Sequence, residues 1–237
     1  KLIVDGKVSS DYSKSVEKIS SCAEIIRLPF GPKRYIKKEL LWPYLDDLAD
    51  LIVQRLQQEK KLPDWIHAHY ADAGYVGALV SRRLGLPLVF TGHSLGREKQ
   101  RRLLAAGIDH DQIEQTYSIS RRIDAEELAL AHSNLLITST KQESEEQYAR
   151  YGRFRSENIE IIPPGVDLNR FHSIHSNRKE EENEIDKLLK PFLRDSNLPP
   201  LLAISRAVRR KNIPALIETY GRSSILRQRH NLILILG

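Results

Sequence analysis

Polar side chains that can contact a sugar or an anion follow two short apolar runs in the first half of the chain. Residues 66–72 read IHAHYAD, and residues 89–99 read VFTGHSLGREK. A histidine beside a glycine turn, such as His93, can contact a sugar or a phosphate, although a histidine at a strand end is more often a structural hydrogen-bonding group. Asp72 fits either a helix N-cap or a contact to a sugar hydroxyl. These residues form a candidate ligand site.

Other residues of the same two segments refine that site. Gly92 and Gly96 favour a turn whose backbone amides face a bound group, and Lys99 adds a positive charge nearby. We expect His67 and His69 to face opposite sides of their strand, which disfavours a metal site built on both. The Cys and His spacing elsewhere in the chain is not typical of a zinc site either.

Basic residues form three further groups that can hold an anion. The first group precedes a predicted helix and comprises Lys33, Arg34, Lys37 and Lys38. It can bind an anion near the positive end of that helix or form a solvated face. Arg121 and Arg122 can clamp a phosphate or pair with Asp124 and Glu126. In the third group, Arg206 follows an apolar run and Lys211 precedes a helix; this arrangement suits a diphosphate, or an ordinary charged loop.

Apolar runs and helical periodicity alternate between residues 41 and 162. We expect strands over 65–68, 87–91, 135–138 and 159–162, and helices over 41–56, 73–84 and 140–152. Apolar strands separated by amphipathic helices are typical of a parallel sheet that is covered on both faces. The sequence therefore predicts an α/β fold with a Rossmann-like sheet. In such folds, ligands bind beyond the carboxyl ends of the strands.

The pattern changes after the PPGVD segment at residues 163–167. A charged stretch without a strand signal follows, and the alternation then restarts with strands over 201–205 and 232–236 around a helix over 214–220. We therefore expect a first domain over 1–166, a linker with an exposed helix over 167–198, and the start of a second Rossmann-like domain over 199–237.

Composition sets limits on the class of protein. The chain has 237 residues, of which 41% are hydrophobic and 29% charged, so it can bury a sizeable core. No apolar run reaches the roughly 20 residues that a membrane helix needs. A net charge of +6 favours anionic ligands, but no nucleic-acid-binding motif is present. The single cysteine fits a reducing compartment, and we expect a cytoplasmic location.

Segments that together cover nearly the whole chain resemble the sucrose-phosphate synthases, within the retaining GT-B glycosyltransferases. These segments are RLPFGPKRYIKKELLWPYL, HAHYADAGYVGALVSRRLGLPLVFTGHSLGREK, RRIDAEELAL, ITSTKQESEEQYARY, IPPGVD and SRAVRRKN. The resemblance implies an acceptor-binding first domain and a nucleotide-sugar-binding second domain. It also implies transfer of glucose from UDP-glucose, or ADP-glucose, to fructose 6-phosphate with retention, releasing UDP and sucrose 6-phosphate.

The resemblance also implies roles for individual residues. The acceptor phosphate is held by Lys33, Arg34, Lys38, Lys99 and Arg121, with Arg121 preferred over Arg122. The catalytic residue is His93, near the reacting carbon of the donor glucose, and Tyr70 and Asp72 line the sugar cleft. Arg206 and Lys211 neutralise the donor diphosphate. No metal ligand, tightly bound cofactor, nucleic acid or membrane is implied, and assistance by Mg²⁺ stays open.

Two features of the family pattern are missing from this chain. They are the glycine-rich loop near the start of the first domain and the pair of glutamates that holds the donor sugar and ribose. Because the chain also lacks methionine, we expect an internal fragment that is inactive by itself. A sucrose synthase or another retaining glucosyltransferase of the same fold is the alternative enzyme. A catalytically silent sugar-phosphate-binding module is the alternative outside catalysis.

Overall fold

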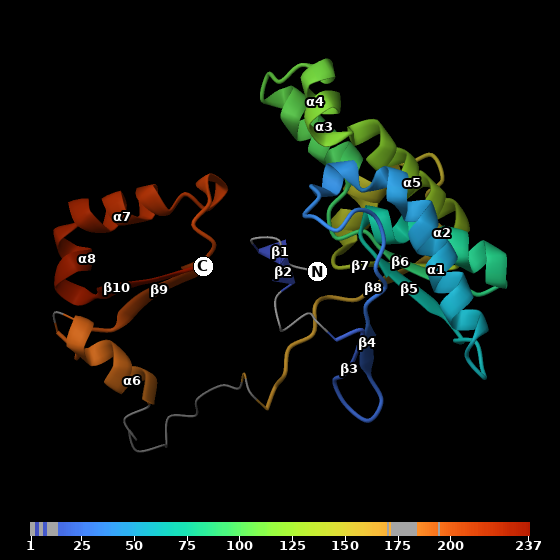
Figure 1. The fold of residues 1–237 in the computed structure, drawn as a ribbon. Coiled ribbons are helices and arrows are strands. Elements are labelled where there is room, and N and C mark those ends of the chain that lie inside the picture. The colour runs from blue at the N-terminus through green and yellow to red at the C-terminus, as the bar shows by residue number, and fades with distance from the viewer. Residues whose placement is uncertain (1–2, 5–6, 9–13, 170, 172–183, 194) are drawn as a thin grey trace. The chain divides into compact units, whose positions relative to one another are not determined.

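The computed structural model describes residues 3–4, 7–8, 14–169, 171, 184–193 and 195–237 (Figure 1). The chain divides into two compact units, Lys1–Val166 and Asp167–Gly237. Much of the linker expected over 167–198 lies outside the described residues. Within the described part, no helix combines the length and the apolar character needed to cross a membrane.

A parallel four-stranded sheet forms the centre of the first unit. Its order is β5 (Ile66–His69), β6 (Leu88–Thr91), β7 (Leu135–Thr138) and β8 (Ile159–Ile161). Every residue of β6 is buried, as expected of a strand covered on both faces. The predicted α/β fold with a Rossmann-like parallel sheet is confirmed.

α-Helices precede the first strand of this sheet and connect its strands. They are α1 (Leu45–Gln57), α2 (Ala71–Leu84), α3 (Gly96–Ala105), α4 (His110–Tyr117) and α5 (Ile119–His132). The α2 helix packs against both α1 and α5 (Figure 1). It ends at Gly85, whose φ of 66° is the left-handed conformation that favours glycine at a helix C-terminus.

Shorter elements complete the first unit. Two antiparallel pairs precede the sheet, β1 (Ile3–Val4) with β2 (Lys7–Val8) and β3 (Val16–Lys18) with β4 (Glu24–Ile26). Single 3₁₀ turns occupy Lys38–Leu40, Trp42–Tyr44 and Ser156–Asn158. The helix expected over 140–152 instead contains a π-helical segment, Glu143–Gln147, followed by a 3₁₀ turn, Tyr148–Arg150.

The second unit contains a parallel pair of strands with two helices between them. Its elements are α6 (Glu184–Leu189), a 3₁₀ turn (Lys190–Phe192), β9 (Pro200–Ser205), a 3₁₀ turn (Arg209–Lys211), α7 (Ile213–Arg222), α8 (Ser224–Arg229) and β10 (Asn231–Leu236). The strands pair in register from Pro200 opposite Asn231 to Ser205 opposite Leu236. This is the strand–helix–strand order that the sequence predicts for residues 199–237.

Close packing of α2 on the sheet depends on a glycine. A Cβ atom on Gly74 would lie 2.6 Å from Cε2 of Phe90 and 3.0 Å from Cβ of Ala129, both in the buried core. Either the Phe90 ring or the helix must shift to admit a methyl group. Gly74 therefore sets how closely α2 approaches β6 and α5.

We expect Gly74→Ala to lower the free energy of unfolding by about 1–3 kcal/mol, because overpacking outweighs the better helix propensity of alanine. Gly221 in α7 is the matched control, since a Cβ there meets nothing within 4 Å. Gly221→Ala should be neutral or stabilise by up to about 1 kcal/mol. Urea denaturation followed by circular dichroism measures both changes. An unchanged midpoint for Gly74→Ala would contradict this account of the packing.

Candidate functional site

The candidate site lies where β5 and β6 end, because parallel pairing places their carboxyl ends at one edge of the sheet. Two residues that follow these ends have positive φ, Tyr70 at 77° and His93 at 57°. Such conformations cost a non-glycine residue about 1–3 kcal/mol and occur often at functional sites. The backbone N–H of Tyr70 donates to the carbonyl of Thr91 over 2.8 Å, which fixes the first turn to the neighbouring strand.

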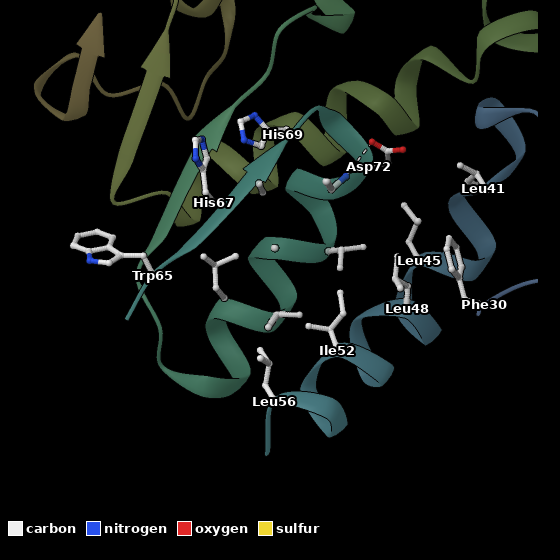
Figure 2. Close-up of a pocket in the computed structure, with 16 residues that line it drawn as sticks. Phe30, Leu41, Leu45, Leu48, Ile52, Leu56, Trp65, His67, His69 and Asp72 are labelled. Carbon is white, nitrogen blue, oxygen red and sulfur yellow. Dashed lines mark hydrogen bonds between the residues drawn. The ribbon is translucent and has the colours of Figure 1, made fainter. Parts of the chain in front are cut away.

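The prediction that His67 and His69 face opposite sides of the sheet is wrong. Residues two apart in a strand point to the same face, and these rings lie 4.0 Å apart between centroids (Figure 2). His69 Nδ1 also lies 2.9 Å from Nε2 of His93. Burial, followed by the neighbouring histidines, lowers the pKa of His67 and of His69, which favours the neutral form of both rings. No group of three metal-ligating side chains suited to an ion occurs among the described residues.

The glycine turn after β6 has an internal role that differs from the expected one. The N–H of Gly92 donates to the hydroxyl of Tyr148 over 2.8 Å, and the N–H of Gly96 donates to the Glu126 carboxylate over 2.9 Å. These amides therefore face the protein interior and do not face a ligand. A Cβ on Gly92 would lie 2.6 Å from the Tyr148 hydroxyl, which explains the glycine at that position.

Three cationic side chains converge on one small pocket beside Tyr70. Its lining includes Lys38, Trp42, Tyr70, Asp72, Lys99 and Arg122. The Lys38 ammonium donates to the Tyr70 hydroxyl over 2.9 Å, and the Arg122 guanidinium lies 4.8 Å from the centre of the same ring. Lys99 Nζ lies 3.3 Å from the centre of the Tyr117 ring. The pocket encloses about 20 Å³, so it admits one small polar group, and a larger ligand would extend from its mouth.

Lys99 carries the clearest electrostatic signature of this pocket. Burial, followed by repulsion from Lys38 and Arg122, lowers the pKa of Lys99 to about 8, although Glu39 opposes the shift. Glu39 and Asp72 also line the pocket, so three cations face two carboxylates. An anion that binds here relieves repulsion among groups that the fold already holds together.

The structure brings together four of the predicted site residues and separates others from them. Lys38, Tyr70, Asp72 and Lys99 line the pocket. Lys33 and Arg34 are exposed and are not among its lining residues. Asp72 lies in the first turn of α2 and accepts from the N–H of Ala73 over 3.0 Å, but the N-cap position belongs to Tyr70.

The pocket contains Arg122, although the sequence interpretation preferred its neighbour Arg121. The buried positions of α5 include Ile119, Arg122, Ile123 and Glu126, which share one helical face. That periodicity was a usable signal for the inward-facing arginine. Trp42 also lines the pocket and was not predicted from the sequence. Its indole N–H is buried and has no hydrogen-bond partner in the described part of the chain.

Arg206 and Lys211 lie in the second unit, on either side of a turn. Arg206 directly follows β9, and Lys211 ends the 3₁₀ turn before α7. The backbone between the two cations is held by hydrogen bonds from the N–H of Val208 to the Arg206 carbonyl over 2.8 Å and from the N–H of Lys211 to the Val208 carbonyl over 2.9 Å. Both side chains are exposed, and neither forms an ion pair with a described residue. The arrangement leaves both cations accessible to a ligand in this unit.

A larger cavity of about 590 Å³ lies along β5, between that strand and helices α1 and α2 (Figure 2). Its walls are mainly aliphatic and include Leu45, Leu48, Ile52, Val76 and Val80. None of the cations described above lines it. Its composition suits apolar packing, whereas Lys38, Lys99 and Arg122 line the smaller pocket.

Comparison with protein families matches residues 11–170 to Glycosyltransferase Family 4. The sucrose-phosphate synthase of Spinacia oleracea is 37% identical over 97% of this chain and 26% of the relative. A probable sucrose-phosphate synthase of Solanum tuberosum is 39% identical over 92% of this chain and 25% of the relative. The chain thus spans about a quarter of the length of these curated relatives.

Solved structures show the same fold. A sucrose-phosphate synthase from Thermosynechococcus elongatus matches with a TM-score of 0.67 at 21% identity, over 95% of this chain and 50% of that chain. Anabaena HepE in complex with UDP and glucose matches with a TM-score of 0.55 at 21% identity, over 85% of this chain and 45% of that chain. These matches confirm the predicted GT-B glycosyltransferase fold.

The low pKa of Lys99 makes a prediction for anion binding. Inorganic phosphate bound at the pocket would raise this pKa, so binding above pH 8 should take up a proton and weaken by up to about tenfold per pH unit. Lys99→Met should bind phosphate more weakly and lose the pH dependence of binding. Lys99→Arg should bind phosphate without this pH dependence, because guanidinium stays charged. Calorimetry in two buffers of different ionisation enthalpy counts the protons. Binding at pH 9 without proton uptake would contradict the prediction.

Proposed function

Because this chain belongs to Glycosyltransferase Family 4 and is homologous to sucrose-phosphate synthases, we propose that it binds both substrates of a sucrose-phosphate synthase-like glucosyltransferase. The donor is UDP-glucose or ADP-glucose, and the acceptor is fructose 6-phosphate. Glucose moves to the acceptor with retention of anomeric configuration, which releases the nucleoside diphosphate and sucrose 6-phosphate. Residues 1–166 form the acceptor domain, 167–198 the linker, and 199–237 the beginning of the donor domain.

The observation that carries this proposal is the convergence of Lys38, Lys99 and Arg122 on the pocket beside Tyr70. A phosphate monoester carries nearly two negative charges at pH 7 and accepts several hydrogen bonds, which matches this donor-rich pocket. The enclosed volume admits part of the phosphate, and the sugar extends from the mouth toward Asp72. Fixing a substrate by a remote phosphate orients its reacting hydroxyl, an effect worth roughly 7 kcal/mol or more in the best-oriented systems.

The donor side follows the same electrostatic logic. Glycosyl transfer develops positive charge on the sugar and negative charge on the leaving diphosphate, and preorganised cations stabilise that negative charge. We assign this role to Arg206 and Lys211. The proposed contact of His93 is with the donor glucose near the reacting carbon. Nε2 of His93 lies 2.9 Å from Nδ1 of His69, which leaves Nδ1 of His93 for a hydrogen bond to the sugar.

The acceptor preference tests the proposal in the full-length protein. We expect kcat/KM for fructose 6-phosphate to exceed that for fructose by a large factor at saturating donor. Lys99→Ala should reduce the value for fructose 6-phosphate by roughly 10- to 100-fold, the effect of one lost charge-assisted contact, and leave that for fructose nearly unchanged. Arg102→Ala is the matched control, because this exposed cation lies on the same helix.

Equal use of the two acceptors by the unmutated protein would favour a sucrose synthase-like enzyme instead. Binding of fructose 6-phosphate without any transfer would favour a silent sugar-phosphate-binding module. Arg121→Ala decides between the adjacent arginines: an unchanged preference for the phosphorylated acceptor assigns the phosphate contact to Arg122.

A separate measurement tests the donor residues. Arg206→Ala and Lys211→Ala should each weaken UDP binding by roughly 10- to 100-fold, because each removes one charge-assisted contact to the diphosphate. Arg227→Ala in α8 serves as the control for loss of an exposed cation in the same unit. Calorimetric titration with UDP gives the affinities. UDP binding that is equal in all three variants would show that Arg206 and Lys211 are ordinary surface charges.

A further inference from the structure

Glu126 is a carboxylate with no exposed surface, at 0% relative exposure on α5. Buried carboxylates in proteins are rare unless they are paired. Burial is the main influence on this residue and raises the pKa of its carboxyl group, while its partners act in the opposite direction. Each of those partners donates a hydrogen bond to it, so the surroundings are built to receive an acceptor group.

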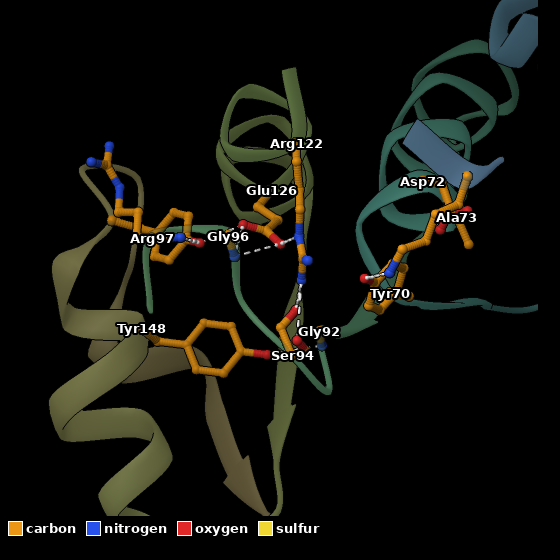
Figure 3. Close-up of polar contacts among 12 residues, drawn as sticks. Tyr70, Asp72, Ala73, Gly92, Ser94, Gly96, Arg97, Arg122, Glu126 and Tyr148 are labelled. Atoms are coloured by element: carbon orange, nitrogen blue, oxygen red, sulfur yellow. Dashed lines mark hydrogen bonds and ion pairs between the residues drawn. The ribbon is translucent and has the colours of Figure 1, made fainter. Parts of the chain in front are cut away.

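Three segments of the chain meet at this carboxylate (Figure 3). Arg122 Nε donates to it over 3.0 Å, the N–H of Gly96 donates over 2.9 Å, and the Tyr151 hydroxyl donates as well. The Tyr151 oxygen in turn accepts from the N–H of Arg97 over 3.0 Å. Glu126 thus joins α5 to the start of α3 and to the segment after β7.

Two of these contacts lead directly to the cationic pocket. Arg122 extends between Glu126 and Ser94, and its Nη2 donates to the Ser94 carbonyl (Figure 3). Gly96 is the first residue of α3, and Lys99 lies one turn further along the same helix. A Cβ on Gly96 would lie 2.9 Å from a Glu126 oxygen, so glycine permits this close approach. The orientation of Arg122 and the start of the helix that carries Lys99 therefore depend on one group.

We propose that Glu126 is a positioning residue, which holds the Arg122 guanidinium and the first turn of α3 so that Arg122 and Lys99 contact the acceptor phosphate together. This inference rests on the proposed function, since it names the device that makes the phosphate pocket selective. Glu126 itself does not touch the substrate. Its effect passes through two cations that do.

The adjacent residue provides a matched control. Glu127 accepts hydrogen bonds from Arg97 Nη2 over 2.8 Å and from the N–H groups of Gly152 and Arg153 over 3.0 and 2.9 Å. Like Glu126, it joins α5 to α3 and to the segment after β7: the contact with α3 is through the Arg97 side chain, and the contacts with the segment after β7 are through the two backbone amides. It has no contact with Arg122 or with Gly96 among the described interactions. The two glutamates therefore separate a positioning role from a general structural one.

The experiment compares Glu126→Ala, Glu126→Gln and Glu127→Ala in the full-length protein. The readout is the ratio of kcat/KM for fructose 6-phosphate to that for fructose, with KM for the nucleotide sugar and the thermal midpoint measured alongside. Glu126→Ala should lower this ratio at least tenfold, mainly through KM for fructose 6-phosphate. Glu126→Gln keeps one acceptor oxygen and should retain more of the ratio, with a loss of about threefold. Glu127→Ala should lower the thermal midpoint without changing the ratio.

Three outcomes would overturn the inference. One is an unchanged ratio in a folded Glu126→Ala protein, and another is an equal loss of the ratio in Glu127→Ala. If Glu126→Ala does not fold, Glu126→Gln decides: a ratio equal to or above that of the unmutated protein would mean that Glu126 only weakens the positive field of the pocket. Failure of the proposed function is distinct, because the unmutated protein would then show no preference for fructose 6-phosphate.

Discussion

The parallel pairing of β5 with β6 is the constraint on which the rest of the first unit depends. Its register places His69 opposite Thr91, so both chains leave the sheet at the same level. Tyr70 and the turn at His93 follow immediately, and each adopts a positive φ that only a well-packed surrounding sustains. The cations from three other elements, the turn before α1, α3 and α5, then converge around Tyr70. A shift of this register by one residue would exchange the faces of β5 and dismantle the site.

Repulsion among those cations is the cost of having them in place before a ligand arrives. The low pKa of Lys99 records that cost, because burial and two neighbouring positive charges disfavour its charged form. Buried hydrogen bonds to Glu126 and packing of α2 on the sheet offset it. The arrangement fits a pocket in which some folding stability is lost so that the cations are already oriented. An enzyme gains most from groups that need not rearrange during binding and reaction.

The sequence was sufficient for the sheet and insufficient for much of the site. Apolar runs revealed all four parallel strands, because burial on both faces removes polar residues from them. The helix α3 could not be predicted, because its sequence GREKQRRLLA has few apolar positions. The helix depends on tertiary contacts at its first turn. The glycine turn was misassigned because the partners of Gly92 and Gly96 lie far away in the sequence, at Tyr148 and Glu126. By contrast, the inward orientation of Arg122 was present in the helical periodicity.

The two proposed anion sites differ in how firmly their cations are held. Arg122 is 5% exposed and bonded to Glu126 and Ser94, and Lys99 lies against the Tyr117 ring. Arg206 and Lys211 are exposed, and backbone hydrogen bonds hold the turn between them. Ordering a long side chain on binding costs about 0.5–1.5 kcal/mol, so the donor site bears more of this cost per contact. The difference suits the proposed chemistry. A rigid acceptor pocket discriminates between sugars by one phosphate, whereas the charge of a diphosphate is enough to order the exposed cations that bind it.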